Sequence, residues 1–443
     1  MPLQPEDIFN ILKPYLIPVW EIIKSWWWLP APFILWPQFK FYWLWWKNDL
    51  WYAKKITPIL LDIKIPKEVL KPIRAMEMVF NGLWQILYIP PNWWEKWIDG
   101  EFQLSYTLEI VCIDGEPHFY IRLPEHARAP AEAMIYAQYP EAQVSLAEDY
   151  AKKVPQSIPN KDWNMWGADY KFLKKDPYPI RTYKEFETEH EAKEEKRIDP
   201  LSILLEAMAK IKKGEQLWVQ MRIKPVTNDE KPWLDEAKKI RDELARRTNK
   251  KKNGKSVITE AAEFLLTGTM PEESKKEEKE LLPPEMKLTP GEREVITKVE
   301  EKMAKPAFDT NIRFIYLGKR DVYFQPNLRL PMSYFGAFST SDCNTLVPWG
   351  GKDGTLTKVP KVWWLIPNFL VPRKLYLRKR QLFRRYVART APKFPRAGGT
   401  FIMNTEELAT IYHFPGKSSA SAPSLERIES KRGEAPPGLP TGE

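Results

Sequence analysis

Between residues 104 and 150, the pattern of hydrophobic and polar positions predicts a strand, a tight turn, a second strand, a helix and a third strand. The strand stretches alternate apolar and polar residues, whereas the helical stretch carries small and apolar residues at helical spacing as far as Pro140. Asp114-Gly115 is the strongest short-range signal for a hairpin turn. In order, the five elements read TLEIVCI, DG, HFYIRL, EHARAPAEAMIYAQY and AQVSLAEDY. This β-β-α-β order is most of one ferredoxin-like (split βαβ) unit.

The same periodicities continue on both sides of this stretch. ILLDIKI is a strand pattern, and the helical pattern that follows is kinked or started late by Pro72. After a run of charge, a second helix is predicted with Asp199 as its N-cap and a stop at Gly214. EQLWVQMRIKPV then alternates as a strand. We expect two helices on one face of the sheet, and the other face left for a partner or for the adjacent domain.

The pattern of the C-terminal half predicts a second α/β unit, and a degenerate copy of the first is one hypothesis for it. An amphipathic helix after Lys231 leads into a charged, proline-marked linker. A capping box, in which Thr289 caps and Glu292 reaches back, then opens another helix. FDTNIRFIYLGKR follows as a strand, and FIMNTEELATIYHFP predicts a strand and a helix capped at Asn404 or Thr405.

Residues 1–52 are rich in tryptophan and broken by prolines. Acidic residues near the start and the lack of a small-residue cleavage site exclude a secretory signal peptide. The longest uncharged run, 25–39, is shorter than the roughly 20 residues of a single span. Because tryptophan favours the headgroup level of a membrane, we expect a short hairpin or an interfacial segment, and the alternative is an arm packed on protein. The expected membrane-contact residues are Trp20, Trp26, Trp27, Trp28, Trp36, Trp43, Trp45, Trp46 and Trp51.

Charge is concentrated in one stretch of the second half. Residues 371–396 hold ten basic residues and no acid, which equals the net charge of +10 of the whole chain. A basic helix here can face anionic lipid, contact the phosphates of a nucleic acid, or pack with a solvated basic face. The candidate contact residues for lipid or nucleic acid are Arg373, Lys374, Arg378, Lys379, Arg380, Arg384, Arg385 and Arg389.

Recognised catalytic and metal-binding motifs are absent from the sequence. The four histidines lack zinc-type spacing, and no nucleophile elbow, GxGxxG or HExxH pattern occurs. Cys112 lies mid-strand, where a small buried hydrophobic role is expected, and Cys343 is far away in the sequence. We therefore expect no catalytic residue, no metal site, no cofactor and no enzymatic activity.

Several strings together resemble an uncharacterised bacterial family of membrane-anchored proteins that is common in reduced-genome candidate phyla. The strings are ILLDIKIPKEV, AMEMVFNGLW, LEIVCIDGEPHFYIRLP, AEAMIYAQYPEAQV, DPLSILLEAMAKIKKGEQLWVQ, FIMNTEELATIYHFP and SLERIESKRGEAPPGLP, and they extend from about Leu60 to Leu439. That family resembles the N-terminal, non-ATPase portion of conjugation-type (type IV secretion) ATPases. The chain departs from the ATPases because it has no GxxxxGK[ST], and WGGKDGTLTK reads as a turn-rich loop. The family-motif residues, with structural roles, are Gln138, Tyr139, Pro140, Asn404, Glu407 and His413.

The pattern and the resemblance together predict an α+β protein with two ferredoxin-like or related modules after a hydrophobic, aromatic membrane segment. The expected parts are a membrane-anchor or interfacial segment (1–52), a first α+β domain with an insertion (53–230), a helix and flexible charged linker (231–288), a second α+β domain with the basic helix (289–415) and a disordered tail (416–443).

The resemblance implies a non-catalytic scaffold of a type IV secretion or conjugation-like system that docks a separate ATPase. Its place would be the inner (cytoplasmic) membrane, with the bulk of the chain facing the cytoplasm. The alternative is a membrane-tethered nucleic-acid-binding protein that uses the basic helix 373–396. The cargo, the stoichiometry and the identity of the ATPase stay open.

Overall fold

A computed structural model of the chain forms two compact units. The N-terminal unit comprises Met1–Thr57 and Ile89–Gln103, and the sheet unit comprises Pro58–Tyr88 and Leu104–Glu443. The chain therefore passes between the two units three times. The structure describes residues 31–65, 71–186, 199–226, 231–246, 288–351, 354–358, 370–392 and 398–415, with the isolated positions Glu21, Lys24, Ser25 and Asn228.

One antiparallel sheet of nine strands organises the sheet unit. The strands are β1 (Pro58–Lys64), β2 (Tyr106–Ile113), β3 (Glu116–Pro124), β4 (Gln143–Ala147), β5 (Trp163–Phe172), β6 (Glu215–Pro225), β7 (Ala307–Lys319), β8 (Leu346–Pro348) and β9 (Phe401–Asn404). Their order across the sheet is β4-β1-β3-β2-β6-β7-β5-β8. Strand β9 pairs with the first residues of β7, and β5 pairs with its later residues, so these two lie end to end along one edge of β7.

The strands and the helices between them form two successive runs of the same kind. The helices are α3 (Ile73–Leu87), α4 (Arg128–Gln138), α6 (Leu201–Ala209) and α10 (Arg329–Gly336). The first run is β1-α3-β2-β3-α4-β4 and the second is β5-α6-β6-β7-α10-β8. If the four strands of each run are numbered 1 to 4 along the chain, both runs have the strand order 4-1-3-2 from the outer edge inward. The two runs join where β2 pairs with β6.

The sheet continues across the boundary that the sequence predicted at residue 230. Strand β6 lies before this boundary and β7 after it, and the two pair from Glu215 opposite Gly318 to Pro225 opposite Phe308. The structure therefore joins in one unit what the sequence pattern separated into two domains. Most of the predicted linker, and the whole predicted tail 416–443, lie outside the described residues.

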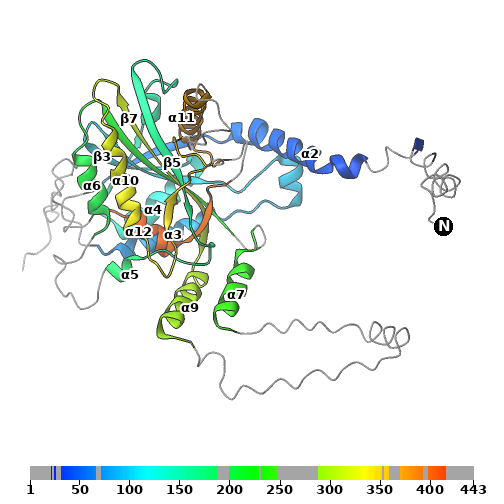
Figure 1. Ribbon diagram of the computed structural model, residues 1–443. Coiled ribbons are helices and arrows are strands. Elements are labelled where there is room, and N and C mark those ends of the chain that lie inside the picture. The colour runs from blue at the N-terminus through cyan, green and yellow to red at the C-terminus, as the bar shows by residue number, and fades with distance from the viewer. Residues whose placement is uncertain are drawn as a thin grey trace, which may run out of the picture. The chain divides into compact units, whose positions relative to one another are not determined.

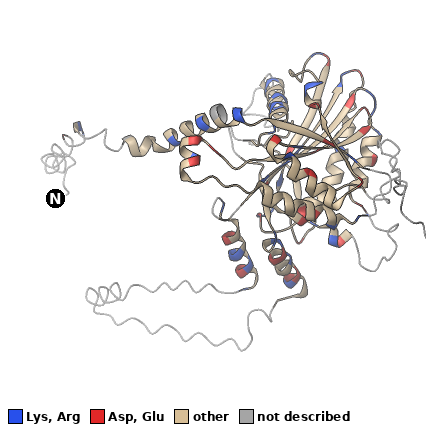
Figure 2. Ribbon diagram, turned by 180° about the vertical axis from the view of Figure 1, so that it is seen from behind, with Lys and Arg blue, Asp and Glu red and all other residues tan. Residues whose placement is uncertain are grey.

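Several local predictions are confirmed in the sheet unit. Asp114 and Gly115 both have positive φ, 54° and 95°, as the tight turn between β2 and β3 requires. Helix α3 begins directly after Pro72. Helix α9 (Pro290–Met303) opens with the Thr289–Glu292 capping box. Figure 1 shows α9 beside α7 (Trp233–Leu244), and Figure 2 shows both acidic and basic positions along this pair.

Both faces of the sheet are covered by the chain itself. The main core lies on the face that packs against α3, α4, α6 and α10, together with α12 (Thr405–Ile411). A second core on the opposite face is formed by strand side chains, by residues 150–158 and by α11 (Leu370–Ala388). The expectation that this second face is left for a partner or for the adjacent domain is confirmed in part, because α11, which the sequence analysis assigned to the second domain, packs there through Leu382, Phe383 and Tyr386.

The C-terminal strand and helix are central rather than peripheral. Every residue from 401 to 415 is buried. Asn404 caps α12 and forms a capping box with Glu407, as the sequence predicted for Asn404 or Thr405. Helix α12 packs on α3, so the last described segment of the chain completes the core around one of the first helices.

The described residues of the N-terminal unit form short helical segments. They are α2 (Ala31–Trp45), the π-helical turn η1 (Trp46–Tyr52), the short 3₁₀ turn η2 (Ala53–Lys55) and the π-helical turn η3 (Glu95–Asp99). Helix α2 has 15 residues. Among the residues that the structure describes, no helix is both long and apolar enough to cross a membrane.

Candidate functional site

Polar side chains form a row across the middle of the second face of the sheet. Glu109 of β2 lies opposite Gln220 of β6, Gln220 opposite Arg313 of β7, and Arg313 opposite Asp169 of β5. None of the four has measurable exposure to solvent. Buried charges of this kind are costly unless they are paired, so the row identifies the candidate functional site.

Arg389, just after α11, supplies one of the two positive charges of this site. Its Nε lies 3.0 Å from Glu109 Oε1, and its Nη1 lies 2.6 Å from Asp149 Oδ2. Glu109 also accepts hydrogen bonds from the Tyr150 hydroxyl at 2.7 Å and from Gln220 Nε2 at 2.8 Å. Tyr150 and Tyr386 join their hydroxyls at 2.8 Å. The arginine thus fastens the end of α11 to the sheet.

The backbone at Arg389 shows that this contact is maintained against a conformational cost. Its φ is +52°, in the left-handed region that favours glycine. Its N–H donates to Tyr386 O at 3.0 Å, and the N–H of Thr390 donates to Arg385 O at 3.1 Å. This pair of bonds is the Schellman pattern, in which glycine usually occupies the left-handed position. An arginine occupies this left-handed position because its side chain pairs with the carboxylates of Glu109 and Asp149.

The charged groups shift one another's pKa values. Burial alone would raise the pKa of Asp149, but the hydrogen bonds and charge of Arg389 outweigh it, so the pKa of Asp149 is lowered. Burial would lower the pKa of Arg389, and the nearby Glu109 and Asp149 reverse this effect and raise it. Both groups therefore stay ionised at neutral pH.

Arg313 forms the second ion pair of the row. Its Nε lies 3.0 Å from Asp169 Oδ1, and its Nη2 donates to Thr390 O at 2.6 Å. Asn311 accepts from the same guanidinium and donates to Asp169 Oδ1 at 3.2 Å. Asp169 Oδ2, Gln220 Oε1 and Arg313 Nη1 have no hydrogen-bond partner among the described residues. The row and its neighbours contain carboxylates, guanidinium groups and tyrosine hydroxyls. The described groups form their hydrogen bonds and ion pairs mainly with one another.

The predicted basic residues of α11 do not form one uniform surface. Arg373, Lys374 and Arg384 are exposed, whereas Arg378, Lys379, Arg380 and Arg385 are half-buried and Arg389 is buried. Lys379 Nζ donates to Asn164 Oδ1 at 2.8 Å, and Arg378 donates to backbone carbonyls of the loop 351–358. Arg389 therefore takes no part in an exposed basic surface, since its guanidinium is committed to the core.

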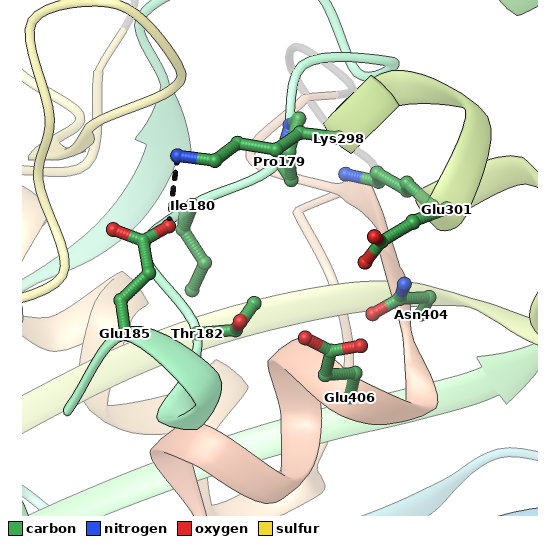
Figure 3. Close-up of a pocket in the computed structure, with 9 residues that line it drawn as sticks. Pro179, Ile180, Thr182, Glu185, Lys298, Glu301, Asn404 and Glu406 are labelled. Atoms are coloured by element: carbon green, nitrogen blue, oxygen red, sulfur yellow. Dashed lines mark ion pairs between the residues drawn. The ribbon is translucent and has the colours of Figure 1, made fainter. Parts of the chain in front are cut away.

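A second cluster of charge surrounds a small pocket beside α12 (Figure 3). Lys298 forms an ion pair with Glu185 at 3.0 Å, drawn as a dashed line in Figure 3. Lys184 bridges two other glutamates of the pocket, Glu301 at 2.9 Å and Glu406 at 3.1 Å. The pocket has a volume of about 30 Å³. Such a volume suits about two water molecules and is far below that of a small-molecule site.

Below this pocket, Lys302 and Glu407 form a fully buried ion pair at 3.1 Å. Burial raises the pKa of Glu407, although Lys302 and backbone N–H groups act in the opposite direction. Glu407 Oε1 accepts from the backbone N–H of Ile180 at 2.9 Å, and Glu407 also closes the capping box of α12. This pair holds the C-terminal helix in place.

The structure brings several of the predicted family-motif residues together. Tyr139, which follows α4, packs its ring edge-on to Phe414 with centroids 5.0 Å apart. His413 Nε2 lies 2.8 Å from Asp199 Oδ1, at the start of α6. Gln138 is half-buried and Pro140 is exposed. The strings QYP and HFP, far apart in the sequence, therefore meet in one packing contact.

The predicted membrane-contact tryptophans are described only in part. Trp36, Trp45 and Trp46 are exposed and Trp43 is half-buried. Trp51 lies in η1, and nothing is described of its side chain. Trp20, Trp26, Trp27 and Trp28 lie outside the described residues.

Neither cysteine has the surroundings of a reactive thiol. Both are buried, as expected for Cys112, whose Sγ donates to Met208 O at 3.4 Å. Burial raises the pKa of Cys112 to about 12 and also raises that of Cys343. Within the described parts of the chain, no three His, Cys, Asp or Glu side chains are grouped as a metal ion would require.

We expect both thiols of the folded protein to react slowly with a thiol-specific disulfide reagent at pH 8, because the reactive thiolate is scarce and access is blocked. Absorbance at the reagent's wavelength should rise quickly only after denaturant is added. Fast reaction of one thiol in the native protein would contradict the burial of that cysteine.

Sequence reasoning missed the polar row, although the signal was present. Glu109, Gln220 and Arg313 each stand alone among apolar residues in the middle of a strand pattern. A lone polar residue at an inward position needs a buried partner. The pattern could have identified these residues but not their partner Arg389, which is 280 positions from Glu109.

Comparison with known families gives one match. A family model described as a domain of unknown function (DUF8128) matches residues 104–323. The matched range contains β2 to β7, and so includes all four strands of the polar row. No curated protein matches the chain.

Proposed function

We propose that this chain is a non-catalytic, membrane-associated scaffold of a type IV secretion or conjugation-like system, which docks a separate ATPase. The supporting sequence argument is the resemblance to the non-ATPase portion of conjugation-type ATPases without a phosphate-binding loop. In this account the sheet unit is a rigid docking body, and the N-terminal unit attaches it to the inner membrane with the bulk of the chain in the cytoplasm.

The observation that carries the scaffold proposal is the commitment of the buried charges to one another. Glu109 and Asp149 are bound by Arg389, Asp169 by Arg313, and Glu407 by Lys302. The Arg389 pairs connect the end of α11 to the sheet, the Arg313 pair joins β7 to β5, and the Lys302 pair joins α9 to α12, so these charges hold elements together rather than line a large cleft. Paired interior charges are well suited to fixing one arrangement of helices, which is what a docking platform needs.

For the fold, we propose that the two runs of β-α-β-β-α-β are two ferredoxin-like modules joined edge to edge. The support is that each run has the strand order 4-1-3-2 and contributes two helices to the same face. The join between β2 and β6 places Glu109 and Gln220, one from each module, opposite each other.

The test of the scaffold proposal is affinity capture of the full-length chain from detergent-solubilised membranes of its source cells after nuclease treatment. We expect an ATPase with a phosphate-binding loop to elute with the chain in a fixed ratio. The variant Arg389→Ala disrupts the docking platform, so a matched capture with this variant should recover less of the ATPase. Absence of any ATPase from the full-length capture would contradict the proposal.

Nucleic-acid binding is the second candidate, and it is favoured by the exposure of Arg373, Lys374 and Arg384 on α11. If it is correct, replacing these three residues by alanine should weaken binding to duplex DNA by roughly tenfold or more and flatten its dependence on salt. Fluorescence anisotropy at several salt concentrations measures both effects. No binding by the unmodified chain at low salt would exclude this candidate.

A further inference from the structure

A segment between α3 and β2 belongs to the N-terminal unit. Residues Ile89–Gln103 connect α3 to β2, both of which lie in the sheet unit, yet they pack with α2 and η1. The indole N–H of Trp43 donates to Trp97 O at 2.9 Å, and the rings of Trp36 and Trp97 stack with centroids 6.0 Å apart.

The contact between the two segments is close enough to require a glycine. Gly100 has φ +75°, and a Cβ there would lie 2.7 Å from Lys47 O. Tyr52 of η1 also meets Phe102 edge-on, with ring centroids 5.6 Å apart. The two segments therefore form one surface, although their contacting positions are 50 to 61 residues apart in the sequence.

This joint surface exposes much apolar and aromatic area. Trp93 is 68% exposed, Trp94 60% and Ile89 66%, and on α2 Phe33 is 78% and Tyr42 64% exposed. Residues 1–57 and 89–103 together contain 12 of the 20 tryptophans of the chain. An exposed surface of this kind marks a site of interaction with a membrane or with another protein.

The chemistry of the surface favours a lipid bilayer. The described positions of α2 from Pro32 to Tyr42 are exposed and mostly apolar on every side. A groove on a protein would cover only one side of such a helix. Tryptophan and tyrosine combine an apolar ring with a polar N–H or O–H and gather at the headgroup level. Lys40 and Lys47 lie within 6 Å of tryptophan rings, where an ammonium can stay among the headgroups while its stem is buried.

The length of α2 favours a position along the membrane surface. Its 15 residues extend about 22 Å, less than the roughly 30 Å of a hydrocarbon core. Its partner η3 carries Glu95 and Asp99, which would remain in the aqueous headgroup region.

We propose that residues 89–103 and α2 form a single surface that lies in the headgroup region of a lipid bilayer, with Trp93 and Trp94 entering the bilayer beside α2. This inference rests on the membrane association proposed above and adds a second contact segment to it. Because this segment is held in the sheet unit at both of its ends, the surface tethers that unit to the membrane through three chain connections.

The test is cosedimentation of the full-length chain with vesicles made of equal parts of phosphatidylcholine and phosphatidylglycerol. We expect W93S/W94S to lower the partition coefficient about tenfold or more, since two largely exposed indoles are lost. The variant W93Y/W94Y keeps the interfacial preference and should retain most of the binding. The matched control L173S/F324S, which removes exposed apolar side chains of the sheet unit, should change binding less than about twofold.

Each outcome decides a different part of the account. If the unmodified chain does not bind the vesicles, both this inference and the membrane part of the proposed function are overturned. If the unmodified chain and W93S/W94S bind equally, the membrane association stands and the second contact segment is overturned. Vesicles with brominated acyl chains provide an independent readout, because the fluorescence of the unmodified chain should be quenched more than that of W93S/W94S.

Discussion

Replacing Arg389 by alanine is expected to lower the free energy of unfolding by about 3–5 kcal/mol, because it leaves Glu109 buried without its positive partner. Asp149 would lose the same guanidinium. Urea unfolding followed by circular dichroism measures the change. On α11 itself, the exposed Arg384 provides the matched control, and Arg384→Ala should change stability by less than about 0.5 kcal/mol.

The left-handed backbone at Arg389 gives this prediction a second, finer test. Arg389→Gly loses the same ion pairs as Arg389→Ala but relieves the strain of a positive φ. The glycine variant should therefore be more stable than the alanine variant by about 1 kcal/mol. Equal stability of Arg389→Ala, Arg384→Ala and the unmodified chain would show that the buried cluster does not hold α11.

Replacing Tyr412 by alanine is expected to cost about 3–5 kcal/mol, since it removes a fully buried ring from the centre of the core. Its ring lies 6.0 Å from that of Phe119 and 6.4 Å from that of Phe80. Among the described residues, the hydroxyl makes one long hydrogen bond, of 3.4 Å, to Tyr120 O. Tyr412→Phe, which keeps the ring, should therefore cost less than about 1.5 kcal/mol.

The same unfolding measurement shows whether the C-terminal strand and helix are part of the core or peripheral to it. Phe324 is 58% exposed in the same unit, so Phe324→Ala should be nearly neutral. If Tyr412→Ala were as mild as Phe324→Ala, the C-terminal strand and helix would be an accessory to the fold rather than part of its core.

Local structure was largely predictable from the sequence because its causes are local. Asp114-Gly115 determines the hairpin through positive φ values, Pro72 sets the start of α3, and Thr289 with Glu292 caps α9. The α+β class follows from the alternation of strand and helix patterns. The basic stretch was also predicted to be helical, and α11 extends from Leu370 to Ala388.

Pairing over long sequence distances was not predictable in the same way. Strand β6 pairs with β7 across about 80 intervening residues, and no local signal selects this neighbour over another strand. The sequence therefore placed a domain boundary where the sheet is continuous. It also assigned Arg389 to a basic surface, because charge along a helix does not reveal that the last residue turns inward to Glu109.

The central claim is that the N-terminal unit attaches the sheet unit to a membrane. The most direct test is fractionation of cells that produce either the full-length chain or a chain that begins at Ala53, which lacks α2 and η1 and keeps residues 89–103. The account predicts that the full-length chain sediments with the membranes and that most of the shortened chain is released. Recovery of the full-length chain in the soluble fraction would contradict the account.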